Sequence, residues 1–154
     1  MKHQKAAFAA GCFWKPQALI DKVKGVVSTE VGYMGGDKKN PTYGDVCSGA
    51  TGHAETVLVV FGPPKISYGE LLEMFWKMHD PTQVNRQGLD VGTQYRSVIF
   101  YFTEAQKKAA TSALAEKQEK LAGKIATKIA KATDFWKAEE YHQKFLVKNR
   151  GKIC

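Results

Sequence analysis

The hydrophobic and polar residues of this chain switch between the two-residue alternation of a strand and the spacing of about 3.6 residues typical of a helix. Four segments are predicted to be strands: 5–10, 26–33, 55–61 and 96–102. Helices are predicted at 13–24, with Pro16 in the first turn, and after Ser67 and Glu70, which match a capping box. This β-α-β-β-α-β order is typical of a ferredoxin-like two-layer α/β sandwich (split βαβ order), so we expect an α+β fold.

The chain after its fourth strand is expected to extend this core. Thr103 and Gln106 match a second capping box, which predicts a helix to about Leu121. The alternation of residues 125–129 predicts a short edge strand, and Asp134 is expected to cap a last helix. Four aromatic residues are predicted on the inward face of that helix: Phe135, Trp136, Tyr141 and Phe145.

No internal repeat or linker divides the sequence. Residues 1–154 are therefore expected to form a single domain, with a mobile C-terminal tail over about 149–154. The polar segment 37–53 is long for a loop in a compact domain, and such loops are usually functional or disordered. A second polar loop is expected at 79–94.

Composition narrows the class of protein. Hydrophobic residues make up 44% of the 154 residues and charged residues 25%, the balance of a globular domain rather than of a disordered or fibrous chain. No apolar run is long enough for a membrane-spanning helix. The net charge of +8 is concentrated after residue 103, where 12 Lys and Arg stand against 6 Asp and Glu. These lysines are spaced as on solvated helix faces, so nucleic-acid binding is not expected.

The three cysteines are too few, and odd in number, for a disulfide-stapled secreted module. The start of the chain resembles a lipoprotein signal, since Lys2 and Lys5 precede an apolar stretch that ends at Gly11-Cys12. However, only the five residues 6–10 form that stretch, whereas a signal peptide needs about 7–15 apolar residues. We therefore expect a cytoplasmic protein with reduced thiols.

The stretch Gly11-Cys12-Phe13-Trp14 carries the first chemical signal. Cys12 lies where a predicted strand meets a helix N-terminus, whose backbone N–H groups and dipole favour the reactive thiolate. Phe13 and Trp14 would supply apolar walls for a small uncharged group. From this stretch alone, a structural cysteine between two core aromatic residues is an equal alternative.

Further motifs follow in order along the whole chain. They are Gly35-Gly36, Pro41-Thr42-Tyr43, Val46-Cys47-Ser48-Gly49, Thr51-Gly52-His53-Ala54-Glu55, Phe75-Trp76, His79-Asp80-Pro81, Gly92-Thr93-Gln94-Tyr95-Arg96-Ser97, Ala138-Glu139 and His142-Gln143. Together with the Cys12 motif, they make the sequence resemble the peptide methionine sulfoxide reductase A family, which reduces methionine-S-sulfoxide. The resemblance implies a thiol-dependent oxidoreductase that repairs oxidised methionine, free or in proteins.

The resemblance implies that Cys12 attacks the sulfoxide sulfur and becomes a sulfenic acid, and that Glu55 protonates the sulfoxide oxygen. Chemistry agrees with the second role, because this oxygen leaves poorly until it is protonated. Glu55 opens a strongly apolar strand, where desolvation is expected to raise its pKa and keep it protonated near neutral pH. Without the motif, a surface carboxylate at a strand end would be the simpler interpretation.

Other residues acquire roles only through the resemblance. Tyr43 and Tyr95 match two phenols that hydrogen-bond the sulfoxide oxygen, and Asp90 matches a carboxylate that helps to hold substrate or water. Phe13 and Trp14 match the pocket for the terminal methyl group of the substrate. The expected substrate-binding set is Phe13, Trp14, Tyr43, Glu55, Asp90 and Tyr95.

The sulfenic acid must be cleared by a second thiol, and an external dithiol then reduces the resulting disulfide. The resemblance implies a resolving cysteine in a C-terminal segment, and Cys154 stands at the end of such a segment. Cys47 is interpreted as structural. Electrons are expected from thioredoxin or another dithiol, without a metal or an organic cofactor.

Two departures from the family pattern concern the pocket and the relay. Lys15, Pro16 and Gln17 follow the Cys12 motif, whereas the family commonly has a glycine and, soon after, a glutamate. The rim of the pocket is therefore expected to differ. The chain stops at Cys154, so we expect a simple two-thiol relay without the second recycling cysteine of some members.

Three other functions fit parts of the sequence. Cys47, His53 and Glu55 are close together, with His79-Asp80 as further candidate ligands, but their spacing matches no common zinc pattern, and His53 is interpreted as ordering its loop. A thiol peroxidase would use the same sulfenic acid but would want a cationic partner for its thiolate. A basic binding module would not depend on Cys12. A monomeric reductase is the preferred interpretation.

Overall fold

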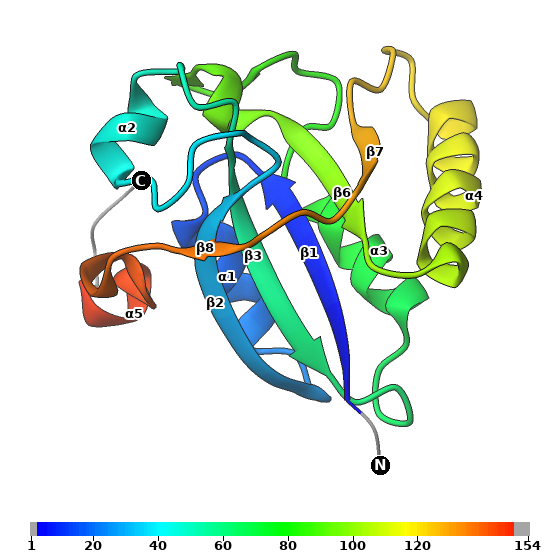
Figure 1. The fold of residues 1–154 in the computed structure, drawn as a ribbon. Coiled ribbons are helices and arrows are strands. Elements are labelled where there is room, and N and C mark those ends of the chain that lie inside the picture. Colours follow the sequence, from blue (N-terminus) through cyan, green and yellow to red (C-terminus); the bar gives the residue numbers. More distant parts are fainter. Residues whose placement is uncertain (1–2, 150–154) are drawn as a thin grey trace.

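The computed structural model describes residues 3–149, which fold around one mixed β-sheet (Figure 1). The helices are α1 (Trp14–Asp21), α2 (Tyr43–Cys47), α3 (Tyr68–Lys77), α4 (Glu104–Lys120) and α5 (Phe145–Lys148), with 3₁₀ turns η1 (Thr93–Tyr95) and η2 (Glu140–His142). The strands of the sheet are β1 (Gln4–Ala10), β2 (Val26–Met34), β3 (Ala54–Phe61), β6 (Ser97–Tyr101), β7 (Lys128–Lys131) and β8 (Trp136–Lys137). A separate hairpin consists of β4 (Arg86–Gln87) and β5 (Asp90–Val91).

The strands of the sheet lie in the order β7-β6-β1-β3-β2-β8. β1 runs antiparallel to both β3 and β6, and β2 runs antiparallel to β3 and β8, whereas β7 is parallel to β6. The four strands and two helices predicted for the first two thirds of the chain are present, as β1, α1, β2, β3, α3 and β6. The expected edge strand is also present, but it begins at Lys128.

The two faces of the sheet are covered differently. On one face, Phe8 and Val57 belong to a core cluster with Leu71 and Phe75 of α3 and with residues of α1 and α4. On the other face, side chains such as Phe100 form a smaller cluster under the chain that follows β7, which crosses the sheet as an extended segment (Figure 1). Both faces of β1 are therefore buried, which explains its continuous apolar run.

The predicted last helix, from Asp134 to about Asn149, is present only near its end, as α5. Instead of starting a helix at Asp134, the chain crosses the sheet, and Trp136–Lys137 pairs with β2. A Cβ on Gly32 would collide with the Trp136 carbonyl and the Phe135 ring, so this glycine permits the close approach. The helix prediction was wrong because pairing with β2 satisfies the backbone hydrogen bonds of a segment whose apolar spacing alone suggested a helix.

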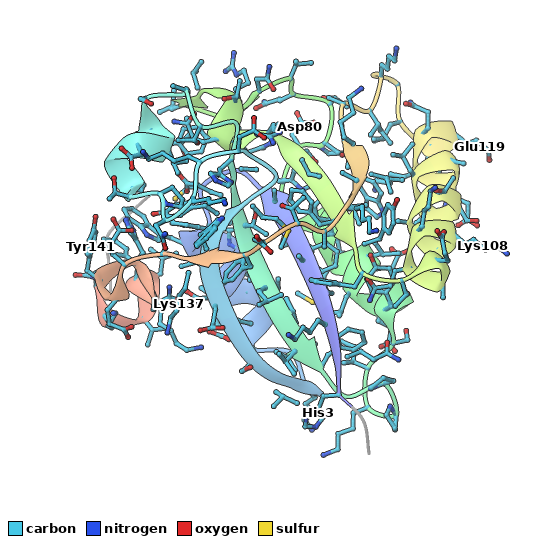
Figure 2. The ribbon with its side chains drawn as sticks, viewed as in Figure 1. His3, Asp80, Lys108, Glu119, Lys137 and Tyr141 are labelled. Carbon is cyan, nitrogen blue, oxygen red and sulfur yellow. The ribbon has the colours of Figure 1, made fainter. Side chains whose placement is uncertain are left out.

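The prediction that Tyr141 faces inward was also wrong, because this side chain is 57% exposed and points away from the sheet (Figure 2). The other three aromatic residues of the expected helix are partly buried. The chain is held here by Gln143 instead, whose side chain accepts from the Val31 N–H and donates to the Val31 carbonyl, both at 2.9 Å. The C-terminal part is thus anchored by side-chain hydrogen bonds to β2.

Two helix predictions need smaller corrections. α1 ends at Asp21, three residues early, and the chain then turns at Gly25, which has φ +98°. The expected loop 37–53 contains the short helix α2, opened by a capping box in which Thr42 and Asp45 each accept from the other's backbone N–H. Five residues are too few to show helical periodicity, so this helix was missed.

α4 begins with only half of the expected capping box. The Thr103 hydroxyl accepts from the Gln106 N–H at 3.1 Å, but the Gln106 side chain accepts from the Phe102 N–H and donates to the Lys5 carbonyl. The Gln106 side chain therefore links α4 to β1 instead of completing the capping box. The outer side of α4 is solvated, and Lys108 points away from the sheet (Figure 2). Among residues 3–149, no helix is long and apolar enough to cross a membrane.

Candidate active site

Cys12 lies in the turn between β1 and α1 and is half-buried. Gly11 makes this turn with φ +85°, and a Cβ there would come within 2.8 Å of Gln87 Cβ. The glycine therefore lets the β4–β5 hairpin pack against the turn. α1 starts two residues later, at Trp14, so Cys12 stands in a turn before a helix N-terminus, a position that favours a thiolate.

Glu55 lies beside this turn because β3 pairs with β1 in the sheet. Its side chain is 1% exposed, and its Oε1 accepts from the Phe13 N–H at 3.3 Å. Phe13 is the N-cap residue of α1 and makes no side-chain cap of its own, so a carboxyl from another strand serves the helix N-terminus. Burial favours the neutral acid form of such a carboxyl. A group able to give a proton is thus held next to Cys12.

Tyr43 opens α2 and Tyr95 ends η1, but the two phenols hydrogen-bond to each other, and Tyr43 also hydrogen-bonds to the Cys47 thiol. Burial, aided by the Glu55 carboxyl, raises the pKa of Tyr95 to about 12. The pKa of Tyr43 is raised as well, first by burial and then by the hydrogen bond to Cys47. Both phenols therefore keep their protons at neutral pH and can donate hydrogen bonds.

Asp90 and Cys12 line the same hollow, which has a volume of about 210 Å³. Asp90 pairs with Gln87 across the β4–β5 hairpin, and cross-strand partners point to the same face, so both side chains line this hollow. Lys15 and His79 line it too, and Lys15 is exposed at its rim. The hairpin therefore brings a carboxylate to the sulfur from a distant part of the chain.

Phe13 and Trp14 form aromatic walls beside the turn. Phe13 is 1% exposed and packs against Tyr33 and His142, with ring centroids 5.9 Å and 5.3 Å away. Trp14 is partly buried and stacks on Phe145 of α5, with centroids 3.7 Å apart and an interplanar angle of 9°. The indole N–H donates to His142 Nδ1 at 3.0 Å.

Two residues to which the sequence assigned no role also lie among these groups, Glu139 and His142. The Glu139 carboxylate accepts from the Tyr33 hydroxyl and from the Tyr43 backbone N–H, both at 2.9 Å. Burial acts to raise the pKa of Glu139, but these hydrogen bonds lower it overall. Both residues stand in recognised motifs, Ala138-Glu139 and His142-Gln143, but the expected helix concealed where they lie.

Two candidates are not part of the cluster as described. Cys154 lies outside the described residues. His53 is buried, its Nδ1 accepts from the Gly36 N–H at 3.0 Å, and its Nε2 lies 2.7 Å from the Lys38 carbonyl, so both ring nitrogens order the loop. Within residues 3–149, no three His, Cys, Asp or Glu side chains are grouped to hold a metal ion.

Comparisons with known proteins agree on one family. The family model described as peptide methionine sulfoxide reductase matches residues 4–154. The chain is 52% identical to peptide methionine sulfoxide reductase MsrA of Methanothermobacter thermautotrophicus, over 99% of this chain and 92% of that protein. It is 54% identical to MsrA of Geobacter metallireducens, over 98% of this chain and 94% of that protein.

Solved structures show the same relationship. The reduced form of Mxr1 from Saccharomyces cerevisiae superposes with a TM-score of 0.95 at 37% identity, over 99% of this chain and 89% of that one. The structure of Mxr1 in complex with Trx2 matches with a TM-score of 0.68 at 28% identity, over 92% of this chain and 84% of that one.

Proposed function

Because this chain belongs to the peptide methionine sulfoxide reductase family, we propose that Cys12, Glu55, Tyr43 and Tyr95 together reduce methionine-S-sulfoxide to methionine. The enzyme is an oxidoreductase that depends on thiols for its electrons. The observation that carries the assignment of residues is the buried Glu55 carboxyl, which is held at the N-terminus of α1 next to Cys12.

In the first step, the Cys12 thiolate attacks the sulfoxide sulfur while Glu55 gives a proton to the sulfoxide oxygen. The hydroxyls of Tyr43 and Tyr95 donate hydrogen bonds to the same oxygen as its negative charge grows, which stabilises the transition state. The oxygen then passes to Cys12 Sγ: a bond forms between this oxygen and Sγ, while the sulfur–oxygen bond of the substrate and the transient bond between the two sulfurs break. Methionine leaves, and Cys12 carries the protonated oxygen as a sulfenic acid. The substrate gains two electrons and Cys12 loses two.

Substrate binding falls to the aromatic walls and the hairpin. Phe13 and Trp14 hold the terminal methyl group, since both present apolar rings beside the Cys12 turn. Asp90 holds the polar part of the substrate or a water molecule, which agrees with its place in the Cys12 hollow. The exposed Lys15 gives this rim a charge that the glycine common in the family lacks.

The sulfenic acid is resolved by Cys154, whose thiol forms a disulfide with Cys12 as water leaves. A thioredoxin-like dithiol then reduces this disulfide and restores both thiols. The complex of the yeast relative Mxr1 with Trx2 supports that choice of partner. No metal or organic cofactor is needed for this relay, and Cys47 is not part of it.

The proposed domain covers residues 1–154 and has a ferredoxin-like core. The antiparallel neighbours β6, β1, β3 and β2 support this description, with α1 and α3 on one face. β7, β8 and the C-terminal helices are additions to that core. The turn that holds Cys12 lies between two elements of this core, after the carboxyl end of β1 and before α1.

The test is turnover of the separate S and R epimers of a methionine sulfoxide with excess dithiothreitol. We expect reduction of the S epimer alone, loss of that activity in Cys12→Ser, and retention in the matched control Cys47→Ser. Equal reduction of both epimers, or an active Cys12→Ser variant, would contradict the assignment. Turnover of peroxide in place of sulfoxide would indicate a thiol peroxidase.

A further inference from the structure

His142 is the buried centre of the aromatic cluster around the proposed substrate pocket. Its side chain is 1% exposed. Four rings surround it at centroid distances of 4.1 to 5.7 Å: Tyr141, Tyr43, Phe13 and Trp14. Three of these four residues have proposed roles at the substrate, yet no step of the reaction uses the imidazole.

The hydrogen bond from Trp14 determines the state of this imidazole. An indole nitrogen only donates, so His142 Nδ1 must accept, and the neutral ring carries its proton on Nε2. Among the described residues, this Nε2 finds no hydrogen-bond partner although it is buried. Leaving a buried donor unsatisfied costs free energy. The contacts of the ring with Trp14 and Tyr43 therefore offset the free-energy cost of burying Nε2 without a partner.

Trp14 needs such an anchor because it is only partly buried. Its stacking on Phe145 is nearly parallel, and stacking alone lets one ring slide and turn over the other. A hydrogen bond is directional, so the bond to His142 stops the indole from turning in its own plane. The same imidazole packs against Tyr43, whose backbone is already held by Glu139.

We propose that His142 is a positioning residue that orients the indole of Trp14 and the ring of Tyr43, so that the enzyme holds the methyl group and the oxygen of one sulfoxide together. The proposal rests on the proposed function, since it assigns His142 to the same pocket. It predicts that His142 acts on substrate binding rather than on the reactivity of the Cys12 thiol.

Two variants separate the hydrogen bond from the packing. His142→Phe keeps a ring of similar size but has no acceptor for the indole N–H. His142→Asn loses the ring, but its side-chain oxygen is separated from Cα by the same number of covalent bonds as Nδ1. This oxygen can therefore accept the hydrogen bond from Trp14. If the hydrogen bond to Trp14 orients the indole, His142→Asn should bind substrate better than His142→Phe. If His142 acts by packing alone, His142→Phe should bind substrate better.

The measurement is single-turnover reduction of the S epimer without dithiol, over a range of substrate concentrations. We expect the half-saturating concentration to rise about tenfold in His142→Phe and about threefold or less in His142→Asn, with nearly unchanged saturating rates. Alkylation of Cys12 by iodoacetamide should proceed at the wild-type rate in both variants. A His142→Phe variant with wild-type saturation, or one that binds better than His142→Asn, would overturn the proposal.

Trp14→Phe keeps the test decisive if a His142 variant folds poorly, because it removes the donor of the same bond. We expect weakened saturation in Trp14→Phe, and no further weakening when His142→Phe, which removes the acceptor of the same bond, is added to it. If the rise in half-saturating concentration in the double variant were the product of the rises in the two single variants, the two residues would act independently. That outcome would contradict the proposal. S-epimer turnover by the wild type, measured in parallel, reports on the proposed function separately.

Discussion

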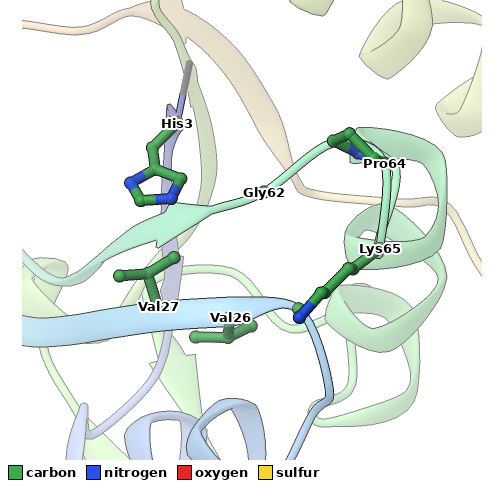
Figure 3. Close-up of a pocket in the computed structure, with 7 residues that line it drawn as sticks. His3, Val26, Val27, Gly62, Pro64 and Lys65 are labelled. Atoms are coloured by element: carbon green, nitrogen blue, oxygen red, sulfur yellow. The ribbon is translucent and has the colours of Figure 1, made fainter. Parts of the chain in front are cut away.

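The two ends of β1 carry hollows of similar size but with different polar groups around them. The hollow at the carboxyl end of the strand, beside Cys12, measures about 210 Å³. The hollow at the amino end measures about 240 Å³ and lies between the turns at Gly25 and Gly62, with His3 and Lys65 at its edge (Figure 3). Volume alone does not distinguish these two places.

Buried polar groups do distinguish them. At the Cys12 end, Glu55 and His142 are each 1% exposed and hydrogen-bond to neighbours of the thiol. At the other end, His3 and Lys65 are exposed, and the turn backbones bond to one another, as in the 2.9 Å bond from the Gly62 N–H to the Gly25 carbonyl. A hollow between two turns follows from the turns themselves, whereas titratable groups buried beside a thiol need another reason to be there.

The strongest test of this contrast removes the acid from Glu55. Glu55→Gln keeps the size of the side chain and an acceptor for the Phe13 N–H but cannot give a proton. We expect the rate of sulfenic acid formation to fall by about 10²- to 10⁴-fold, the usual range for a lost general acid. The matched control is Glu30→Gln, which neutralises a half-exposed carboxylate on β2 and should leave the rate unchanged. A Glu55→Gln variant with more than a tenth of the wild-type rate would refute the role of the acid.

A second test uses the pair of phenols. Tyr43 and Tyr95 hydrogen-bond to each other, so either one can still serve the oxygen when the other is lost. We expect about a tenfold loss of rate or less in each Tyr→Phe variant. In the double variant we expect about a 10²- to 10³-fold loss, the usual cost when hydrogen-bond donation to a developing oxyanion is lost. Rates from single-turnover kinetics check this, and a double variant as active as either single one would contradict it.

The histidines of the two hollows give a test by pH. Burial lowers the pKa of His79 from 6.5 to about 4, whereas His3 is exposed. The unfolded chain binds this proton near pH 6.5 and the folded chain only near pH 4, so the free energy of unfolding falls as pH drops through this window. The loss amounts to up to about 3 kcal/mol, at 1.36 kcal/mol per unit of pKa. Urea unfolding at several pH values should show this slope in the wild type and in His3→Gln, and a weaker slope in His79→Gln.

The smallest effect is expected at the amino end of β1. Lys65→Ala removes a charge from the edge of that hollow, where the side chain is exposed and bonds to no other side chain among residues 3–149. We expect unchanged turnover of the S epimer and a change in the free energy of unfolding within about 0.5 kcal/mol. A clear loss of activity would show that the two ends of the sheet are not as different as their buried groups indicate.

Local sequence patterns predicted the elements that have a clear periodicity or a clear cap. The capping box of Ser67 and Glu70 opens α3 as expected, with the Ser67 hydroxyl accepting from the Glu70 N–H at 3.1 Å. The strand that leads to Cys12 and the helix that follows it were also found, because alternation and the first-turn Pro16 are signals carried by neighbouring residues. The hairpin that brings Asp90 to Cys12 was not predicted, because strands of two residues are too short to show an alternation of polar and apolar side chains.

The sequence by itself determined the order of strands and helices and the residues of the Cys12 motif, because periodicity, caps and motifs lie within a few residues of one another. Only the tertiary structure decided that the chain after β7 leaves its helical pattern, pairs with β2 and delivers Glu139 to Tyr43 and His142 to Trp14. The residues joined by the first of these hydrogen bonds are separated by 96 positions in the sequence, and those joined by the second by 128. Contacts of that range arise from how the sheet is completed, and no local pattern encodes them.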